Sequence, residues 1–389
     1  MAVTIIKEPT QLYPAYNDSF LQFRDSNNNS TYADISITGI LEQSIRIYAN
    51  SNNVFTLNLK NFIKVSFSDT GFEDKALVPL DEDIQVLTDR IVNQRIVISL
   101  EDANDSETFT YSFFRDVNQV IETNNESLNS LLFPNTGENN NYKITYFEGF
   151  PFFIEFKFLN VEDEVTLINN RTGVSYTQSL QFDEDDADDD SFNSLISDRF
   201  LTPSDYGTCR VHLDKITSNV TTDSNFPILE NTVNDISYLI NGELKGNIEL
   251  TARPAKRGIY LKWYNSKGGY SHFKFSEFSR KRFRGRHTEF LTRNEIFNVN
   301  DGLKTGIINQ GQSGEMDLRI RDNITTDELL HIQDILISPS VQMYLSNDPF
   351  TIGGYVDVVL EGRLPMNTKQ PRHDITLNID LPNLNTITY

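Results

Sequence analysis

The chain has 389 residues, a formal net charge of -21 at pH 7 and one cysteine, Cys209. This length allows two or more domains with separate cores, whereas the negative charge argues against a general nucleic-acid binder. One cysteine rules out an intramolecular disulfide and a cysteine-based metal cluster. Phe, Tyr, Asn, Asp, Thr and Ser are frequent and Met is scarce, which favours strands and turns. We therefore expect a mostly β protein with few short helices.

Residues 1–27 contain Pro9, Tyr13, Pro14 and Tyr16 without a sustained apolar period. Because proline fixes φ and removes an amide donor, this segment is predicted to be an extended N-terminal arm. Its aromatic residues need a surface that covers them. Tyr13 and Tyr16 either pack on their own domain or, as candidate subunit-interface residues, dock on a neighbouring copy.

Residues 28–170 form the first predicted β-rich domain. Short strand signals recur between breaks rich in Asn, Asp and Gly, a spacing typical of a β-sandwich or barrel. A later strand around Phe152 to Phe158 is apolar at nearly every position at its start and is predicted to be a central core strand. The other expected strands are Asp34 to Thr38, Ser44 to Tyr48, Phe55 to Leu59, Phe62 to Ser66, Arg95 to Leu100, Thr108 to Phe114 and Lys143 to Phe147.

Residues 171–225 are predicted to be an acidic loop or linker, because the like charges between Asp183 and Asp190 repel one another. One functional alternative is a divalent-cation site, although the glycine and distant glutamate of an EF-hand loop are missing. Another alternative is that this acidic run is a binding site for the basic segment of a neighbouring chain. The candidate interface residues are then Asp185, Asp186, Asp188 and Asp189.

Residues 226–389 form the second predicted β-rich domain. It opens with a hairpin around the turn dipeptide Asn241-Gly242. A second hairpin alternates from Ile259 to Tyr264, turns at residues 265–269 and alternates again to Phe275, with the period of half-buried strands. Trp263, the only tryptophan, is its candidate core anchor. Basic residues crowd the segment that follows: Arg280, Lys281, Arg282, Arg284 and Arg286.

A helix is predicted from Thr325 to Ser338. Thr325 and Glu328 have the spacing of a capping box, apolar residues share one face, and Pro339 ends the pattern. Strands are expected after it through Val341 to Leu345, Tyr355 to Leu360 and Ile375 to Leu381.

The basic hairpin and its continuation have two interpretations. Trp263 can be a core residue, with lysines on the opposite face that protect an edge strand from aggregation. The arginines from Arg280 to Arg286, however, are interleaved with aromatic residues, a combination enriched at interface hot spots. We favour a subunit contact through the arginine-rich segment, with passing DNA as the second choice.

The sequence shows no motif for phosphate, dinucleotide, hydrolase or zinc-protease chemistry. The five histidines lack a local metal-ligand spacing. Cys209 is predicted to be a buried apolar residue rather than a nucleophile served by the nearby His212. We therefore expect no catalytic residue, no metal and no cofactor, and the protein is not predicted to be an enzyme. A glycosidase-like carboxylate pair is the least favoured alternative.

The segment from Ile259 to Phe275 resembles a hairpin of virion and tail proteins from phages that infect Bacteroidetes, including the crAss-like phages. The aromatic segment Tyr13-Pro-Ala-Tyr-Asn and the helix and strand from Asp327 to Tyr344 are similar to further parts of that pattern. The resemblance implies a structural ring or adaptor protein between the portal and the distal tail, in a ring of about 12 copies.

The same resemblance implies a location in the virion tail after synthesis in the host bacterial cytoplasm. The implied partners are further copies of the chain, the portal, other tail proteins and DNA in a channel. No membrane insertion is expected, since no apolar run approaches about 20 residues. The main alternative is a lectin-like surface or fibre-associated protein in which Trp263, Tyr264 and Tyr270 stack on sugars.

Overall fold

The computed structural model confirms a mostly β fold with multiple sheets and few short helices. It describes residues 3–9, 12–27, 29–38, 42–67, 72, 74, 84–87, 90–101, 106–117, 131–134, 140–158, 164–179, 207–216, 228–230, 232–254, 258–276, 278–292, 307–345, 354–364 and 370–381. The chain divides into two compact units. Unit 1 comprises residues 1–252 and 264–271, and unit 2 comprises residues 253–263 and 272–389.

The first half of unit 1 contains two antiparallel-rich sheets around one core. One sheet has the order β2-β9-β8-β4-β5, and the other has the order β1-β3-β6. Alternate residues such as Ile35, Ile37, Ile96 and Ile98 are fully buried, as a period of two requires. The strands are β1 (Val3–Lys7), β2 (Tyr13–Pro14), β3 (Phe20–Asp25), β4 (Tyr32–Thr38), β5 (Glu42–Tyr48), β6 (Phe55–Asn58), β8 (Ile91–Leu100) and β9 (Ser106–Phe114).

The N-terminal segment is extended, but it is not a separate arm. β1 and β3 pair with each other and β3 pairs with β6, so residues 3–25 are part of this half of unit 1. Leu21 and Phe23 are fully buried in its core. Apolar and polar residues alternate from Leu21 to Arg24, but over only one strand. The prolines and turn residues before this strand therefore led to the prediction of an extended arm.

The expected strand from Phe62 to Ser66 is wrong, because these residues belong to helix α1 (Lys60–Ser66). Leu59, Ile63 and Phe67 are each about 1% exposed. Their spacing of four places them on one helical face, and this face is what anchors the helix to the core.

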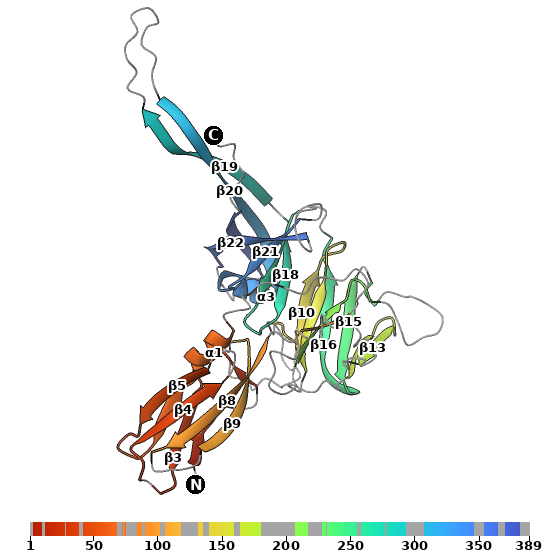
Figure 1. Cartoon of the computed structure of the whole chain (residues 1–389). Coiled ribbons are helices and arrows are strands. Elements are labelled where there is room, and N and C mark those ends of the chain that lie inside the picture. The colour runs from red at the N-terminus through yellow and green to blue at the C-terminus, as the bar shows by residue number, and fades with distance from the viewer. Residues whose placement is uncertain are drawn as a thin grey trace, which may run out of the picture. The chain divides into compact units, whose positions relative to one another are not determined.

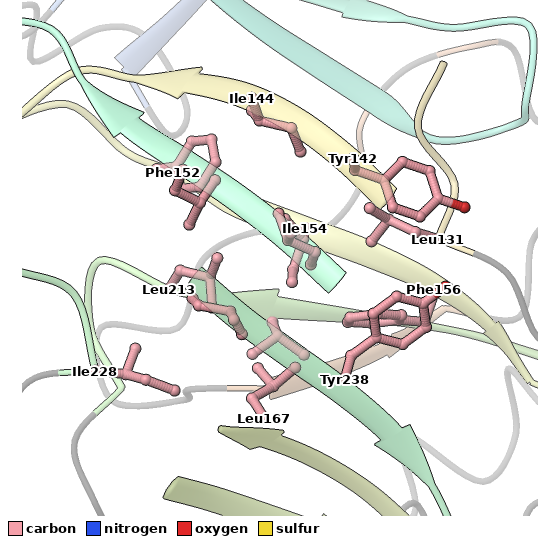
Figure 2. Close-up of a cluster of buried hydrophobic side chains, with 14 of the residues drawn as sticks. Leu131, Tyr142, Ile144, Phe152, Ile154, Phe156, Leu167, Leu213, Ile228 and Tyr238 are labelled. Atoms are coloured by element: carbon pink, nitrogen blue, oxygen red, sulfur yellow. The ribbon is translucent and has the colours of Figure 1, made fainter. Parts of the chain in front are cut away.

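The second half of unit 1 has a larger core between two further sheets (Figure 2). The sheet orders are β10-β16-β15-β12-β13 and β11-β14-β7. Figure 2 shows Phe152, Ile154 and Phe156 converging with Leu167 and Tyr238 in this core. The strands are β7 (Ile84–Leu87), β10 (Asn141–Tyr146), β11 (Phe153–Phe158), β12 (Glu164–Asn169), β13 (Ser175–Ser179), β14 (Gly207–His212), β15 (Val233–Ile240) and β16 (Glu243–Ala252).

The described residues of β11 are buried as predicted, although β11 lies at the end of its three-stranded sheet rather than at its centre. The Asn241-Gly242 hairpin is confirmed, since both residues have positive φ angles of 52° and 74° between β15 and β16. These two strands pair with β12 and β10. The first unit therefore extends to Ala252, beyond the boundary expected after residue 225.

Unit 2 is built on a seven-stranded sheet with the order β18-β17-β21-β22-β23-β20-β19. Helix α3 (Thr326–Ile332) begins with the predicted capping box, and the 3-10 helix η3 (Gln333–Leu336) continues it. The strands are β17 (Ile259–Tyr264), β18 (Tyr270–Phe275), β19 (Phe278–Thr292), β20 (Ile307–Thr325), β21 (Val341–Tyr344), β22 (Tyr355–Arg363) and β23 (Arg372–Asp380). Within the described residues, no helix is long and apolar enough to cross a membrane.

The predicted hairpin of β17 and β18 is present, but it is not half-buried. Lys262 is 4% exposed and Lys274 is 0% exposed, so the lysines do not protect a solvent-facing edge. The Lys262 ammonium group lies 4.0 Å from the centre of the Tyr355 ring. Burial on both faces makes the hairpin a core element.

Candidate functional site: the β19–β20 ribbon

Strands β19 and β20 form a long two-stranded ribbon that runs out from the sheet of unit 2 (Figure 1). The two strands pair from Phe278 opposite Arg321 to Thr292 opposite Ile307. β20 also pairs with β23, but only from Asp317 to Thr325. Among the described residues, the part of β20 before Asp317 therefore has β19 as its only paired strand.

The arginines predicted to form an interface occupy alternate positions of β19. Arg280, Arg282 and Arg284 therefore fall on one face of the ribbon, about 7 Å apart. Arg286 is the next alternate position of β19, and its side chain lies outside the described part of the structure. The partners of the four arginines across the ribbon are Arg319, Asp317, Glu315 and Ser313, so the face is mixed but predominantly basic. We call it the arginine face.

The ion pair between Arg284 and Asp317 on this face is weak. The Nε atom of Arg284 lies 3.9 Å from Oδ1 of Asp317, and the Arg284 side chain is 57% exposed. A pair at this separation and exposure contributes about 0–1 kcal/mol. Arg284 can therefore exchange this pair for a contact with a partner at little energetic cost.

The opposite face carries apolar side chains from the core out into solvent. Ile320 and Leu318 are buried, and the next pair along the ribbon is Met316 opposite Phe283. Phe283 is 68% exposed. We call Phe283, Met316 and the neighbouring Lys281 the apolar face, since Lys281 lies opposite Leu318 on the same side.

The ribbon has features of a binding element rather than of a protected edge. Charged residues and the register shifts near His287 do protect edge strands. Phe283 lies directly opposite Met316, so two neighbouring apolar side chains share this face of the ribbon and offer surface for association. Two-stranded ribbons are also marginally stable in water by themselves. A partner that covers Phe283 would therefore stabilise the ribbon.

Trp263, the candidate core anchor, is buried in unit 2. It is 0% exposed, and its ring centroid lies 5.5 Å from that of His331 in α3. Tyr264 and Tyr270 are 6% and 3% exposed. The three aromatic residues named for the lectin-like alternative are therefore buried and cannot serve as a sugar-stacking platform in this structure.

Tyr13 and Tyr16 pack against the core of unit 1. The Tyr13 hydroxyl donates a hydrogen bond to the backbone carbonyl of Asp18, and the Tyr16 ring stacks on Phe67 at 6.5 Å. Their role in a subunit interface stays a prediction. The acidic run with Asp185, Asp186, Asp188 and Asp189 lies outside the described residues.

A buried ion network in unit 1 was not anticipated from the sequence. Glu155 accepts hydrogen bonds from Arg90 at 2.8 and 3.0 Å and from Arg210 at 2.8 and 2.9 Å. Arg210 also donates two 3.0 Å hydrogen bonds to Asp74. Burial acts to raise the pKa of Glu155, but the two guanidinium groups outweigh it and lower the pKa. The network therefore keeps its charges while buried.

This network holds the hairpin loop of residues 264–271, which belongs to unit 1. The Tyr270 amide donates to Glu155 at 2.7 Å, and Arg90 donates to the Gly268 carbonyl at 2.9 Å. A Cβ atom at Gly269 would lie 2.4 Å from the Leu132 carbonyl oxygen, so only glycine fits. No local sequence pattern joins Arg90, Glu155 and Arg210, because the three come from segments distant in the chain: the turn before β8, strand β11 and strand β14.

Cys209 and His212, the residues considered as a nucleophile and its base, are both buried. Cys209 is fully buried, as predicted, and His212 is 1% exposed with its ring 5.4 Å from that of Phe153. Burial and the nearby Arg210 lower the pKa of His212 to about 4, so the ring is neutral at pH 7. No group of three or more His, Cys, Asp and Glu residues in the described part of the chain is arranged to hold a metal ion.

Comparison with known proteins gives no family. No family model and no curated protein matches this chain. Among solved structures, a bacterial ice-binding adhesin of 1.5 MDa aligns with a TM-score of 0.14 and 9% identity, covering 79% of this chain and 86% of that chain. Cadherin-like domains 1 to 4 of zebrafish RET align with a TM-score of 0.14 and 9% identity, covering 75% and 62%. TM-scores this low do not establish a shared fold.

Proposed function

We propose that this chain is a structural subunit that assembles with other subunits through the β19–β20 ribbon, as a ring or adaptor protein of a phage tail. The observation that supports assembly is the two-faced ribbon itself. It exposes Phe283 on one side and presents alternate arginines on the other. Arginine and aromatic residues are the types that most often carry binding energy at protein interfaces.

The virion assignment rests on the sequence resemblance of the β17–β18 hairpin, the N-terminal aromatic segment and the α3 region. The proposed partners remain further copies of the chain, the portal and other tail proteins, with DNA as a passing contact. The proposed location remains the virion tail. The same proposal includes a role for the aspartates from Asp185 to Asp189 as a binding site for a basic segment.

The test is to replace Arg280, Arg282, Arg284 and Arg286 together with serine. We expect the variant to fold and to assemble more weakly, because basic side chains steer association through long-range attraction. Sedimentation velocity at about 50 and 200 mM salt measures the assembly, and the wild type should weaken with salt as screening increases.

The matched control replaces four exposed basic residues outside the ribbon, Lys7, Arg24, Arg363 and Arg372, with serine. It changes the net charge by the same amount, so a loss of assembly in both variants would point to overall charge rather than to the ribbon. A wild-type protein that stays monomeric in purified form and in intact virions would refute the proposed function.

A further inference from the structure

We infer that the ribbon of one copy docks on the acidic surface of the next copy, in a head-to-tail contact with Phe283 as its anchor. This inference rests on the proposed function, selects one of its partners for the ribbon, and adds the contact type and the division of roles within the ribbon. The partner is thus a second copy of this chain.

Charge complementarity favours a second copy as the occupant. β19 carries five basic residues and one acidic residue, whereas the whole chain has a formal net charge of -21. The ribbon is therefore a basic element on an acidic protein. Acidic surfaces of identical chains repel one another, and a contact between the ribbon and an acidic surface converts that repulsion into attraction.

The same charges disfavour a symmetric contact between two ribbons. In an isologous interface each patch meets its own copy, so arginine faces would meet arginine faces. Stacking by the apolar faces would bring two Lys281 side chains into one small contact, because Lys281 lies one alternate position from Phe283. A heterologous contact avoids both, and such contacts close into rings when the rotation permits.

The charges on the arginine face also favour a protein over a nucleic acid. Asp317 and Glu315 lie directly opposite Arg282 and Arg284 on this face. Carboxylates at these positions would oppose a phosphate backbone, which needs a continuous positive contact. A protein surface of mixed charge with an acidic excess fits both the arginines and the two carboxylates.

The apolar face supplies the anchor. Beyond Phe283 and Met316, the next residues on this face are Gly285 and Gly314, which pair directly with each other. A Cβ atom added at Gly285 would have no neighbour within 4 Å. The pair of glycines leaves a gap beside the projecting Phe283 ring that a side chain of the next copy can enter. Desolvated aromatic residues of this kind dominate affinity, whereas exposed charges mainly set the association rate.

The division of roles predicts different kinetics for two variants. Phe283→Ser should weaken assembly roughly thirtyfold through faster dissociation, as expected for a hot spot. Serine at the four arginines should instead slow association about tenfold and remove most of its salt dependence. Val359→Ser is the control for Phe283→Ser, since Val359 is 65% exposed in β22, outside the ribbon.

The decisive experiment mixes wild type with a ribbon variant that combines Phe283→Ser and the four arginine substitutions, and weighs the products by native mass spectrometry. The variant alone should be monomeric with an unchanged circular dichroism spectrum. In an equal mixture it should still accept the ribbon of a wild-type copy, so oligomers should be shorter and contain one variant copy at an end.

Exclusion of the variant from wild-type oligomers would overturn the inference but not the proposed assembly through the ribbon, since it indicates a symmetric contact. Unchanged assembly of the variant, with or without arginine-dependent binding of a short DNA duplex, would overturn the inference and also the assembly through the ribbon. A wild-type protein that never assembles would instead remove the proposed function and the inference together.

Discussion

At the scale of single residues, Glu155 is the centre of the buried network that fixes the 264–271 loop. It is fully buried between Arg90 and Arg210. Glu155→Gln preserves the shape but leaves Arg90 without its carboxylate partner. Removing one partner of a buried pair typically costs about 3–5 kcal/mol.

We therefore expect Glu155→Gln to lower the free energy of unfolding and to increase hydrogen exchange at the Tyr270 amide, which donates to Glu155. Asp34→Asn is the matched control, because Asp34 forms a pair with Arg46 in which both side chains are about half exposed. Such a pair contributes about 0–1 kcal/mol. Equal effects of the two substitutions would show that the buried network does not hold the loop.

Two buried histidines predict acid sensitivity. Burial lowers the pKa of both His212 and His331 to about 4. In the unfolded chain both titrate near pH 6.5, so below that pH the unfolded state binds more protons than the folded state. Stability should thus fall as the pH drops from about 6.5 to about 4, by up to about 3 kcal/mol per histidine.

The measurement is the urea midpoint as a function of pH. His212→Leu should flatten the dependence, since leucine cannot be protonated and the His212 ring nitrogens make no hydrogen bond within the described residues. A pH dependence of the same slope in the variant would exclude His212 as a source of the effect.

Strand alternation predicted Trp263 as an anchor but did not predict the burial of the lysines beside it. Trp263 shares the apolar face of its strand with Ile259 and Leu261, which favours its burial. One interpretation placed the lysines of this hairpin at a solvent edge, yet Lys262 and Lys274 are both buried. Alternation along a strand identifies one buried face, whereas the packing that covers the second face comes from distant parts of the chain.

At the scale of elements, the sequence predicted structures whose stabilising contacts join residues close together in the chain. Thr325 accepts a hydrogen bond from the Glu328 amide, and the Glu328 side chain accepts one from the Thr325 amide. This reciprocal pair is encoded within four residues. Helix α1 was missed because its seven residues are too few to show a helical period, and its apolar face is completed by Leu59 and Phe67 outside it.

We expect Thr325→Ala to destabilise unit 2 by about 1 kcal/mol, because it removes one side of the capping box. Trp263 packs on His331 of α3, so tryptophan fluorescence during urea denaturation reports on this unit. Thr325→Ser keeps the hydroxyl and should recover most of the loss. A serine variant as unstable as the alanine variant would show that the cap hydrogen bond is not the cause.

At the scale of the whole molecule, the sequence predicted a mostly β chain of several domains but placed the boundary too early. The β15–β16 hairpin follows the acidic segment, yet its strands pair with β10 and β12 of unit 1. Long-range pairing of this kind leaves no local mark. The arginine positions of the candidate site were visible in the sequence, whereas the exposure of Phe283 and the facing glycines emerged only from the strand register.

The central claim is that the ribbon contacts another copy of the chain at acidic side chains. Carbodiimide coupling of Lys281 to carboxylates in an assembly of mixed light and heavy isotope copies tests it directly. We expect mixed-isotope cross-links, which join two copies, between Lys281 and aspartates or glutamates outside the ribbon. Stable oligomers in which Lys281 couples only within its own chain, or not at all, would contradict it.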